Sequence, residues 1–244
     1  MADASDDVPE ADAGGWQWNA RESEHFRISW TNQSPIPGDN VRHDQVIRET
    51  EKLLEESWDT LTAGFGRAPY VSPRQTKIDV VFRDLSVYGD SDPPDRPIRL
   101  NAGAWQSIEG IRAPTVIHEL FHKLQYAFGY RTSWPTKDGD GWFSEGTAAF
   151  VETAFLRRVS DATKFTDAFD QPYRSLWRLD YGASPFWMFV DQTFSTADNR
   201  ALRGFLVNYE ATGDAKLSLR RVVAGARDDP LPEVVANFAS SRLD

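Results

Sequence analysis

Two histidines four positions apart, with a glutamate beside the first, stand in the segment VIHELFHKLQ (116–125). Four residues along an α-helix turn through about 400°, so His118 and His122 lie one turn apart on the same face. Two imidazoles at that spacing can bind one metal ion, at about 2 Å from each nitrogen. Glu119 is placed to reach a water on such an ion without binding the ion itself. The pattern predicts a metal site with Glu119 as general base.

An amphipathic helix with two surface histidines is the alternative interpretation of this segment. A chance HExxH is expected in fewer than roughly one such chain in a hundred. Apolar side chains also surround the helix on nearly every side: Val116, Ile117, Leu120, Phe121, Leu124 and Phe128. Such a helix is largely buried, and buried histidines beside a carboxylate need a partner that offsets the loss of water. The metal site is therefore the favoured interpretation.

A third metal ligand has to come from outside this helix. The extended pattern HExxHxxGxxH is absent, because Gln125 and Phe128 occupy the places of its glycine and last histidine. The remaining histidines, His25 and His43, lie far upstream. A carboxylate from a later helix is the favoured source.

The segment WFSEGTAAFVE (142–152) contains such a carboxylate. Glu145 is separated from His122 by 22 residues, and the small residues at 146–149 would let this helix approach the first closely. We expect Glu145 to be the third ligand.

Together, the two segments resemble the gluzincin metallopeptidases, the group of thermolysin and the zinc aminopeptidases. The string W-x-x-E-G-x-A (142–148) is similar to the aminopeptidase branch in particular. The resemblance covers about 113–155 and is weak elsewhere. It implies a Zn²⁺ ion held by His118, His122 and Glu145 with a water in the fourth position, and a zincin-like fold around the two helices.

Two positions depart from the family pattern. Thermolysin-like enzymes carry an acidic residue four places after the ligand glutamate, where this chain has Ala149. Glu152, seven places on, is expected either to replace it by orienting a histidine or to be a solvated helix charge. The amine-binding motif G-x-M-E-N of the aminopeptidases is also absent, and LNAGAW (100–105) stands in the comparable upstream strand. This absence favours an endopeptidase over an aminopeptidase.

Peptide hydrolysis also needs a hydrogen-bond donor for the tetrahedral oxyanion. In gluzincins this is usually a tyrosine or histidine downstream of the third ligand, and no histidine follows His122. We expect Tyr181, beside a glycine and just before a helix start, to be this donor. Tyr173 is a competing choice, and a core or rim position is the alternative for Tyr181.

A substrate-binding strand is predicted upstream of the motif helix. Asn101, Ala102 and Gly103 are expected in an edge strand along which an extended peptide adds by main-chain pairing. A plain edge strand without this role is the alternative.

The elements that must position these residues indicate an α+β fold, with a small N-terminal mixed sheet, long helices and a helical C-terminal half. The sequence predicts a disordered acidic tail (1–15) and one domain (16–244), with an α/β part to about 130 and a helical part from about 142. Strands are expected at 24–30, 76–82 and 98–105. Helices are expected at about 41–63, from Pro114 to Gly129, from near Phe143, from Ser184, and near 198–210, 215–224 and 231–241.

Composition excludes several classes of function. The formal net charge is −10, and five acidic residues precede the first Lys or Arg, so we expect neither nucleic acid nor an anionic membrane as partner. The absence of cysteine excludes disulfides and thiolate metal ligands. No apolar run reaches the roughly 18 residues of a membrane span. The first residues lack the features of a signal peptide, which predicts a cytoplasmic protein; a secreted protein whose signal has been removed is the alternative.

These features predict a monomeric, zinc-dependent metallopeptidase acting on a peptide or protein substrate. Two alternatives stay open at this point. One is a zinc-dependent hydrolase of a small molecule or of one dedicated precursor peptide. The other is a non-catalytic binding domain on the same scaffold.

Overall fold

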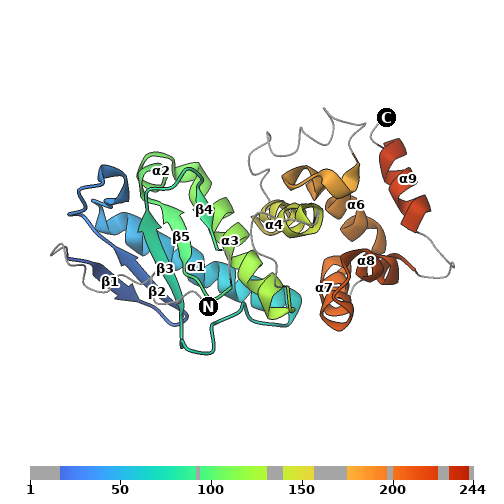
Figure 1. Ribbon diagram of the computed structural model, residues 1–244, viewed down its shortest axis with the longest axis horizontal. Coiled ribbons are helices and arrows are strands. Elements are labelled where there is room, and N and C mark those ends of the chain that lie inside the picture. Colours follow the sequence, from blue (N-terminus) through green and yellow to red (C-terminus); the bar gives the residue numbers. More distant parts are fainter. Residues whose placement is uncertain are drawn as a thin grey trace, which may run out of the picture. The chain divides into compact units, whose positions relative to one another are not determined.

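The computed structural model describes residues 17–91, 94–130, 140–156, 175–196, 200–224 and 231–241. The chain divides into two compact units, Met1–Leu124 and Gln125–Asp244, and the boundary falls inside helix α3 (Arg112–Ala127). The described part of the first unit contains a sheet with helices, and that of the second is helical (Figure 1). The predicted α+β class is confirmed. The expected acidic tail and Tyr173 lie outside the described residues.

The sheet of the first unit has five strands within the described residues, in the order β1-β2-β3-β5-β4. Strand β1 is antiparallel to β2, β2 and β5 are each parallel to β3, and β4 is antiparallel to β5. The sheet is therefore mixed, as expected. The strands are β1 (Asn19–Glu22), β2 (Phe26–Trp30), β3 (Ile78–Arg83), β4 (Gly89–Asp90) and β5 (Ile98–Asn101).

Helix α1 (Asp44–Phe65) packs against β2 and carries the predicted apolar stripe (Figure 1). Leu54 and Leu61 on this stripe are fully buried. The helix begins after His43, whose backbone is extended, and ends at Gly66, whose φ of 68° closes it in the left-handed conformation that glycine adopts without strain.

The prediction for 98–105 is wrong beyond Asn101. Strand β5 ends there and helix α2 (Ala102–Ser107) begins, because the Asn101 side chain accepts a hydrogen bond from the Ala104 N–H and caps the helix. Strand β5 is also not an edge, since it lies between β3 and β4. Asn101, Ala102 and Gly103 therefore do not form an edge strand, and in the described sheet β4 holds that edge.

Helix α3 begins close to the predicted position. The 3-10 turn η2 (Glu109–Ile111) leads into it, and Pro114 lies in its first turn. The buried Arg112 ties this end down, because its guanidinium donates to the Trp105 carbonyl and to Glu49. Gly129, with φ of 88°, follows the other end as expected.

The helices of the second unit enclose an aromatic core. Trp142 stacks on Trp187 with ring centroids 5.5 Å apart, and the Trp187 indole N–H donates to the Trp142 carbonyl. The three predicted C-terminal helices are confirmed to within three residues. The elements are α4 (Gly141–Leu156), η3 (Leu176–Arg178), η4 (Tyr181–Ala183), α6 (Ser184–Phe194), α7 (Ala201–Thr212), α8 (Ala215–Val223) and α9 (Leu231–Ser241).

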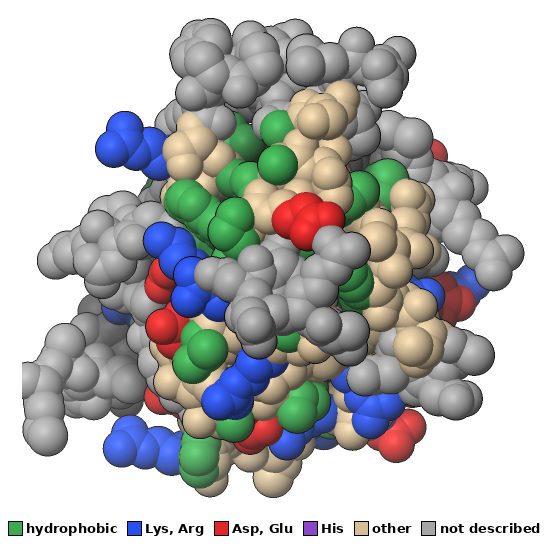
Figure 2. All heavy atoms as spheres, turned by 90° about the vertical axis from the view of Figure 1, so that its right-hand side faces the viewer, with side chains coloured by type: hydrophobic (Ala, Val, Ile, Leu, Met, Phe, Trp, Pro, Cys, Tyr) green, Lys and Arg blue, Asp and Glu red, His purple; other side chains and the backbone are tan. Residues whose placement is uncertain are grey.

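The surface of the second unit is chemically mixed. Figure 2 shows apolar, basic and acidic side chains interspersed on one face. Among the exposed apolar residues are Val207 on α7 and Leu217 on α8. Within the described chain, none of the helices combines the length and apolar character that crossing a membrane requires.

An electrostatic contact joins the start of β2 to α1. Glu55 accepts hydrogen bonds from the backbone N–H of His25, at 3.0 Å, and from its imidazole, at 2.6 Å. Burial alone would raise the pKa of Glu55. The hydrogen bonds from the His25 backbone and the His25 imidazole outweigh it, so the pKa lies below its ordinary value of 4.5.

We expect Glu55→Gln to lower the free energy of unfolding by about 1 kcal/mol at neutral pH, a modest value because both side chains are partly exposed. A lowered carboxyl pKa stabilises the folded state above the unfolded pKa, and that contribution is lost as the pH falls through the folded pKa. The difference between the two proteins should therefore shrink below about pH 4.5. Urea unfolding at several pH values measures it. Glu56→Gln, on an exposed i,i+4 pair, is the matched control; an equal loss in both variants would contradict the prediction.

Candidate metal centre

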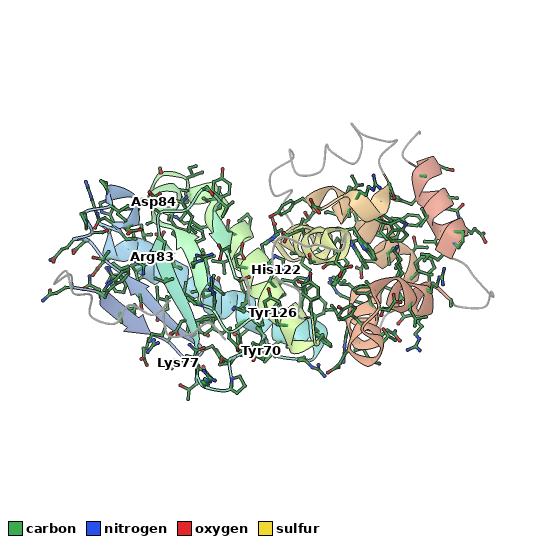
Figure 3. The ribbon with its side chains drawn as sticks, in the orientation of Figure 1. Tyr70, Lys77, Arg83, Asp84, His122 and Tyr126 are labelled. Atoms are coloured by element: carbon green, nitrogen blue, oxygen red, sulfur yellow. The ribbon has the colours of Figure 1, made fainter. Side chains whose placement is uncertain are left out.

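The two histidines of α3 point at one another. Their Nε2 atoms are 3.1 Å apart and their rings are inclined by 79°. Two nitrogens bound to one tetrahedral zinc ion at about 2.0–2.1 Å are separated by about 3.3 Å, so this pair fits the ion. His118 and His122 are 4% and 9% exposed, which contradicts the alternative of two surface histidines. Figure 3 labels His122 with Tyr126, one turn further along α3.

Glu145 completes a group of three. One ligand atom from each of His118, His122 and Glu145 lies within 4.8 Å of the others. Two imidazoles and a carboxylate form a donor set that zinc accepts. Among the described residues, neither His25 nor His43 joins this group.

Glu119, next to the first of these histidines, is 5% exposed. Strand β4 lies against it. A Cβ atom added to Gly89 would be 3.0 Å from Glu119 Cγ and 2.7 Å from Thr115 Cγ2. The absence of a side chain at residue 89 therefore lets the main chain of the edge strand approach the carboxylate.

The first turns of α4 hold Glu145 in a tightly packed segment. A Cβ on Gly146 would be 2.8 Å from Ala183 Cβ and 3.3 Å from the Asp180 carbonyl oxygen. Glycine at this position thus allows the turn at η4 to pack on the helix beside Glu145. The small residues at 146–149 were expected to serve the approach of the motif helix, and this contact with η4 was not foreseen.

Gln125 is a further residue that sequence reasoning missed. It is fully buried in the last turn of α3, and its amide nitrogen donates to the Ser144 carbonyl at 2.9 Å and to the Thr147 hydroxyl at 2.8 Å. The Thr147 hydroxyl in turn donates to the Phe143 carbonyl, so it accepts from Gln125. These bonds hold Ser144 and Thr147, which lie on either side of Glu145 in the first turns of α4. The sequence did carry a signal for Gln125, because it is the residue that breaks the HExxHxxG pattern.

We expect Gln125→Leu to weaken zinc binding by about 10-fold, because residues that orient metal ligands typically contribute 10- to 100-fold to affinity. Leucine keeps the bulk and removes both hydrogen bonds that restrain the Glu145 turn. Competition with a chromogenic chelator measures the affinity. Gln106→Leu is the matched control, since that amide nitrogen also donates two hydrogen bonds, in its case to the main-chain carbonyls of Asn40 and Ala102. Equal zinc affinity in both variants would contradict the role given to Gln125.

Glu152 is fully buried, so the alternative of a solvated helix charge is wrong. It lies two turns beyond Glu145 on the same face of α4. Its role in orienting a histidine stays a prediction.

Tyr181 lies in η4, directly before α6, as expected from the sequence. It is 37% exposed, which contradicts a core position and leaves the rim position open. The contact of this turn with Gly146 places the tyrosine on the segment that packs beside Glu145. Its role as an oxyanion donor also stays a prediction.

The fold is similar to that of M1 zinc metallopeptidases of known structure. A two-domain M1 zinc metallopeptidase mutant bound to L-tryptophan superposes with a TM-score of 0.55 at 15% identity, over 91% of this chain and 51% of that one. An M1 zinc metallopeptidase mutant from Deinococcus radiodurans gives 0.52 at 15% identity, over 93% and 52%. The mutant from the same organism bound to a Tyr-Ser-Ala substrate gives 0.52 at 17% identity, over 92% and 51%.

These identities establish likeness of fold alone, and the chain spans about half the length of the proteins it resembles. No protein-family model and no curated protein sequence matches it. The chain therefore has a fold similar to that of M1 zinc metallopeptidases, and its His-His-Glu group could hold a metal ion.

Proposed function

We propose that the protein is a zinc-dependent metallopeptidase that hydrolyses peptide bonds. The observation that carries the proposal is the convergence of ligand atoms from His118, His122 and Glu145 within 4.8 Å of one another. Burial of Glu119 on the same helix turn and the M1-like fold support it.

Zinc is the metal favoured by two imidazoles and one carboxylate in a buried site. When bound, it would polarise the substrate carbonyl and lower the pKa of a coordinated water. His118, His122 and Glu145 hold the ion in this proposal. Glu152 orients one of the histidines from its buried position on α4.

Glu119 carries the proton transfers. Its carboxylate accepts a proton from the water that attacks the peptide carbonyl carbon, and it then gives that proton to the leaving amine as the C–N bond breaks. Tyr181 donates a hydrogen bond from its hydroxyl to the oxygen that becomes negatively charged.

The edge strand β4 takes the substrate-pairing role that the sequence assigned to Asn101, Ala102 and Gly103. It is one of the two terminal strands of the described sheet, and its Gly89 lies against Glu119. An extended peptide that adds to β4 through main-chain hydrogen bonds would pass beside the general base.

The test is zinc analysis of the purified protein together with cleavage of a peptide library. We expect about one zinc per chain and cleavage that a chelator abolishes and added zinc restores. Cleavage that persists in the metal-free protein would contradict the proposal, as would a protein that binds no zinc.

A second candidate is a zinc hydrolase with one dedicated substrate, a small molecule or a precursor peptide. Strand β4 has only two residues, so it offers few main-chain pairs to a general peptide. Stoichiometric zinc with no cleavage of the library would favour this candidate over a general peptidase.

A further inference from the structure

The hairpin of β4 and β5 contacts one ridge of helix α3. Thr115, Glu119 and Lys123 are spaced by four residues, so they lie in a row along the helix. Gly89 packs against the first two, as described above. Two further residues of the hairpin connection reach the third: the Lys123 ammonium donates to the carbonyls of Pro94, at 2.8 Å, and Arg96, at 2.6 Å.

Lys123 is unusual because it is only 1% exposed. Burying an ammonium group is costly unless it is hydrogen-bonded, and an apolar side chain of the same length would fill the space without that cost. What lysine adds here is this pair of hydrogen bonds, called the tie below, which joins α3 to the main chain that follows β4. Its position next to His122 puts the tie in the same helix turn as a predicted metal ligand.

Further hydrogen bonds join β5 to β4 and connect the segment after β4 to the residues around Lys123. Arg99 on β5 pairs with Asp90 on β4, with Nε 2.8 Å from Oδ1. The hydroxyl of Tyr70, labelled in Figure 3, donates to Asp95, and the Tyr70 N–H donates to the Lys123 carbonyl. A displacement of the connection at Pro94 and Arg96 would therefore be transmitted to β4.

We propose that Lys123 is a positioning residue that holds strand β4 beside Glu119 and so aligns an extended peptide with the metal site. Gly89 permits the close approach at one end of the ridge, and Lys123 secures the hairpin at the other. This inference rests on the proposed peptidase function. It assigns the substrate class as peptides long enough to pair with β4.

The test compares Lys123→Met with Lys77→Met in the zinc-loaded enzyme. Lys77 also donates to a main-chain carbonyl, that of Ser23, and directly precedes β3, which β5 separates from β4. For a peptide of six or more residues we expect Lys123→Met to raise KM by about 10-fold or more with kcat nearly unchanged, because it removes binding along the strand. For a blocked dipeptide the change should be under about 3-fold. Equal losses for both substrates would overturn the proposal.

Hydrogen–deuterium exchange provides a readout that does not depend on activity. We expect amides in 86–91 to exchange at least about 10-fold faster in Lys123→Met than in wild type or Lys77→Met, since a released strand opens locally. Unchanged amide exchange in Lys123→Met would show that the Lys123 hydrogen bonds do not hold β4 in place, whatever substrate the enzyme cleaves. Faster exchange in a protein whose wild type cleaves no peptide would support the tie and count against the proposed function alone.

Gly89→Ala tests the other end of the ridge and covers the case in which Lys123→Met fails to fold. The backbone of Gly89 is not in the left-handed conformation, so alanine at this position is opposed by its clash with Thr115 and Glu119 rather than by backbone strain. We expect the long peptide to lose about 10-fold or more in kcat/KM, because small displacements at a reacting site are costly. Gly110→Ala, where an added Cβ meets nothing within 4 Å, is the control. Equal kcat/KM in the two variants would contradict the close approach.

Discussion

Replacing Glu119 by glutamine is expected to lower kcat for peptide hydrolysis by about 10³-fold, within the range that general acid–base groups contribute. Glutamine has nearly the same shape but cannot accept the proton of the attacking water. The barrier rises by about 4 kcal/mol for that loss. The zinc content should stay unchanged, because Glu119 is not among the three side chains whose ligand atoms converge.

The measurement is kcat and zinc content on the same preparation, with thermal unfolding to show that the variant folds. Glu109→Gln is the matched control, since Glu109 is exposed in the turn that leads into α3. Turnover by Glu119→Gln equal to that of the control would exclude Glu119 as the general base.

His122→Ala is expected to lose stoichiometric zinc and, with it, all chelator-sensitive hydrolysis. Its Nε2 is 3.1 Å from that of His118, and alanine would leave one imidazole and one carboxylate, too few ligands for a closed tetrahedral site. We expect the zinc affinity to fall by more than about 100-fold, beyond the range seen for residues that only orient ligands.

Elemental analysis after dialysis against a weak chelator tests this expectation. His43→Ala is the control, because His43 is exposed and precedes α1 without joining the ligand group. Gln125→Leu should fall between the two. Zinc retained at one per chain in His122→Ala would exclude the site as described, and zinc lost in both histidine variants would point to general unfolding.

The motif helix shows what local sequence determines. The spacing of His118 and His122 brings both imidazoles to one face in any α-helix, and the apolar residues around them predict burial, which the structure confirms. The long helix α1, strand β2 and the C-terminal helices were likewise predicted from local patterns, with periods of 3.6 or 2 residues within a single element. Strand β3 was predicted from its β-rich composition.

Strand order and edge position were not available from periodicity. The segment after Asn101 was expected to continue as an edge strand, yet a side-chain cap turns it into helix α2. The edge of the described sheet next to β5 is formed by the two residues of β4, a segment too short to carry a periodic pattern. Gly89 acquires its significance only from its distance to Glu119, which depends on how the hairpin folds back on α3.

The amino-acid sequence by itself determined which residue types meet on the motif helix and that the fold is α+β, and it predicted a later glutamate as the third ligand. Tertiary structure alone decided that ligand atoms of Glu145 and the two histidines lie within 4.8 Å of one another, that Glu152 is buried, and that Gln125 and Lys123 are tied to neighbouring segments. The physical reason is the separation along the sequence of the residues that make these contacts. Helix geometry is set by bonds between residues four apart, whereas these contacts join residues separated by about 20 or more positions, whose meeting depends on the packing of the whole chain.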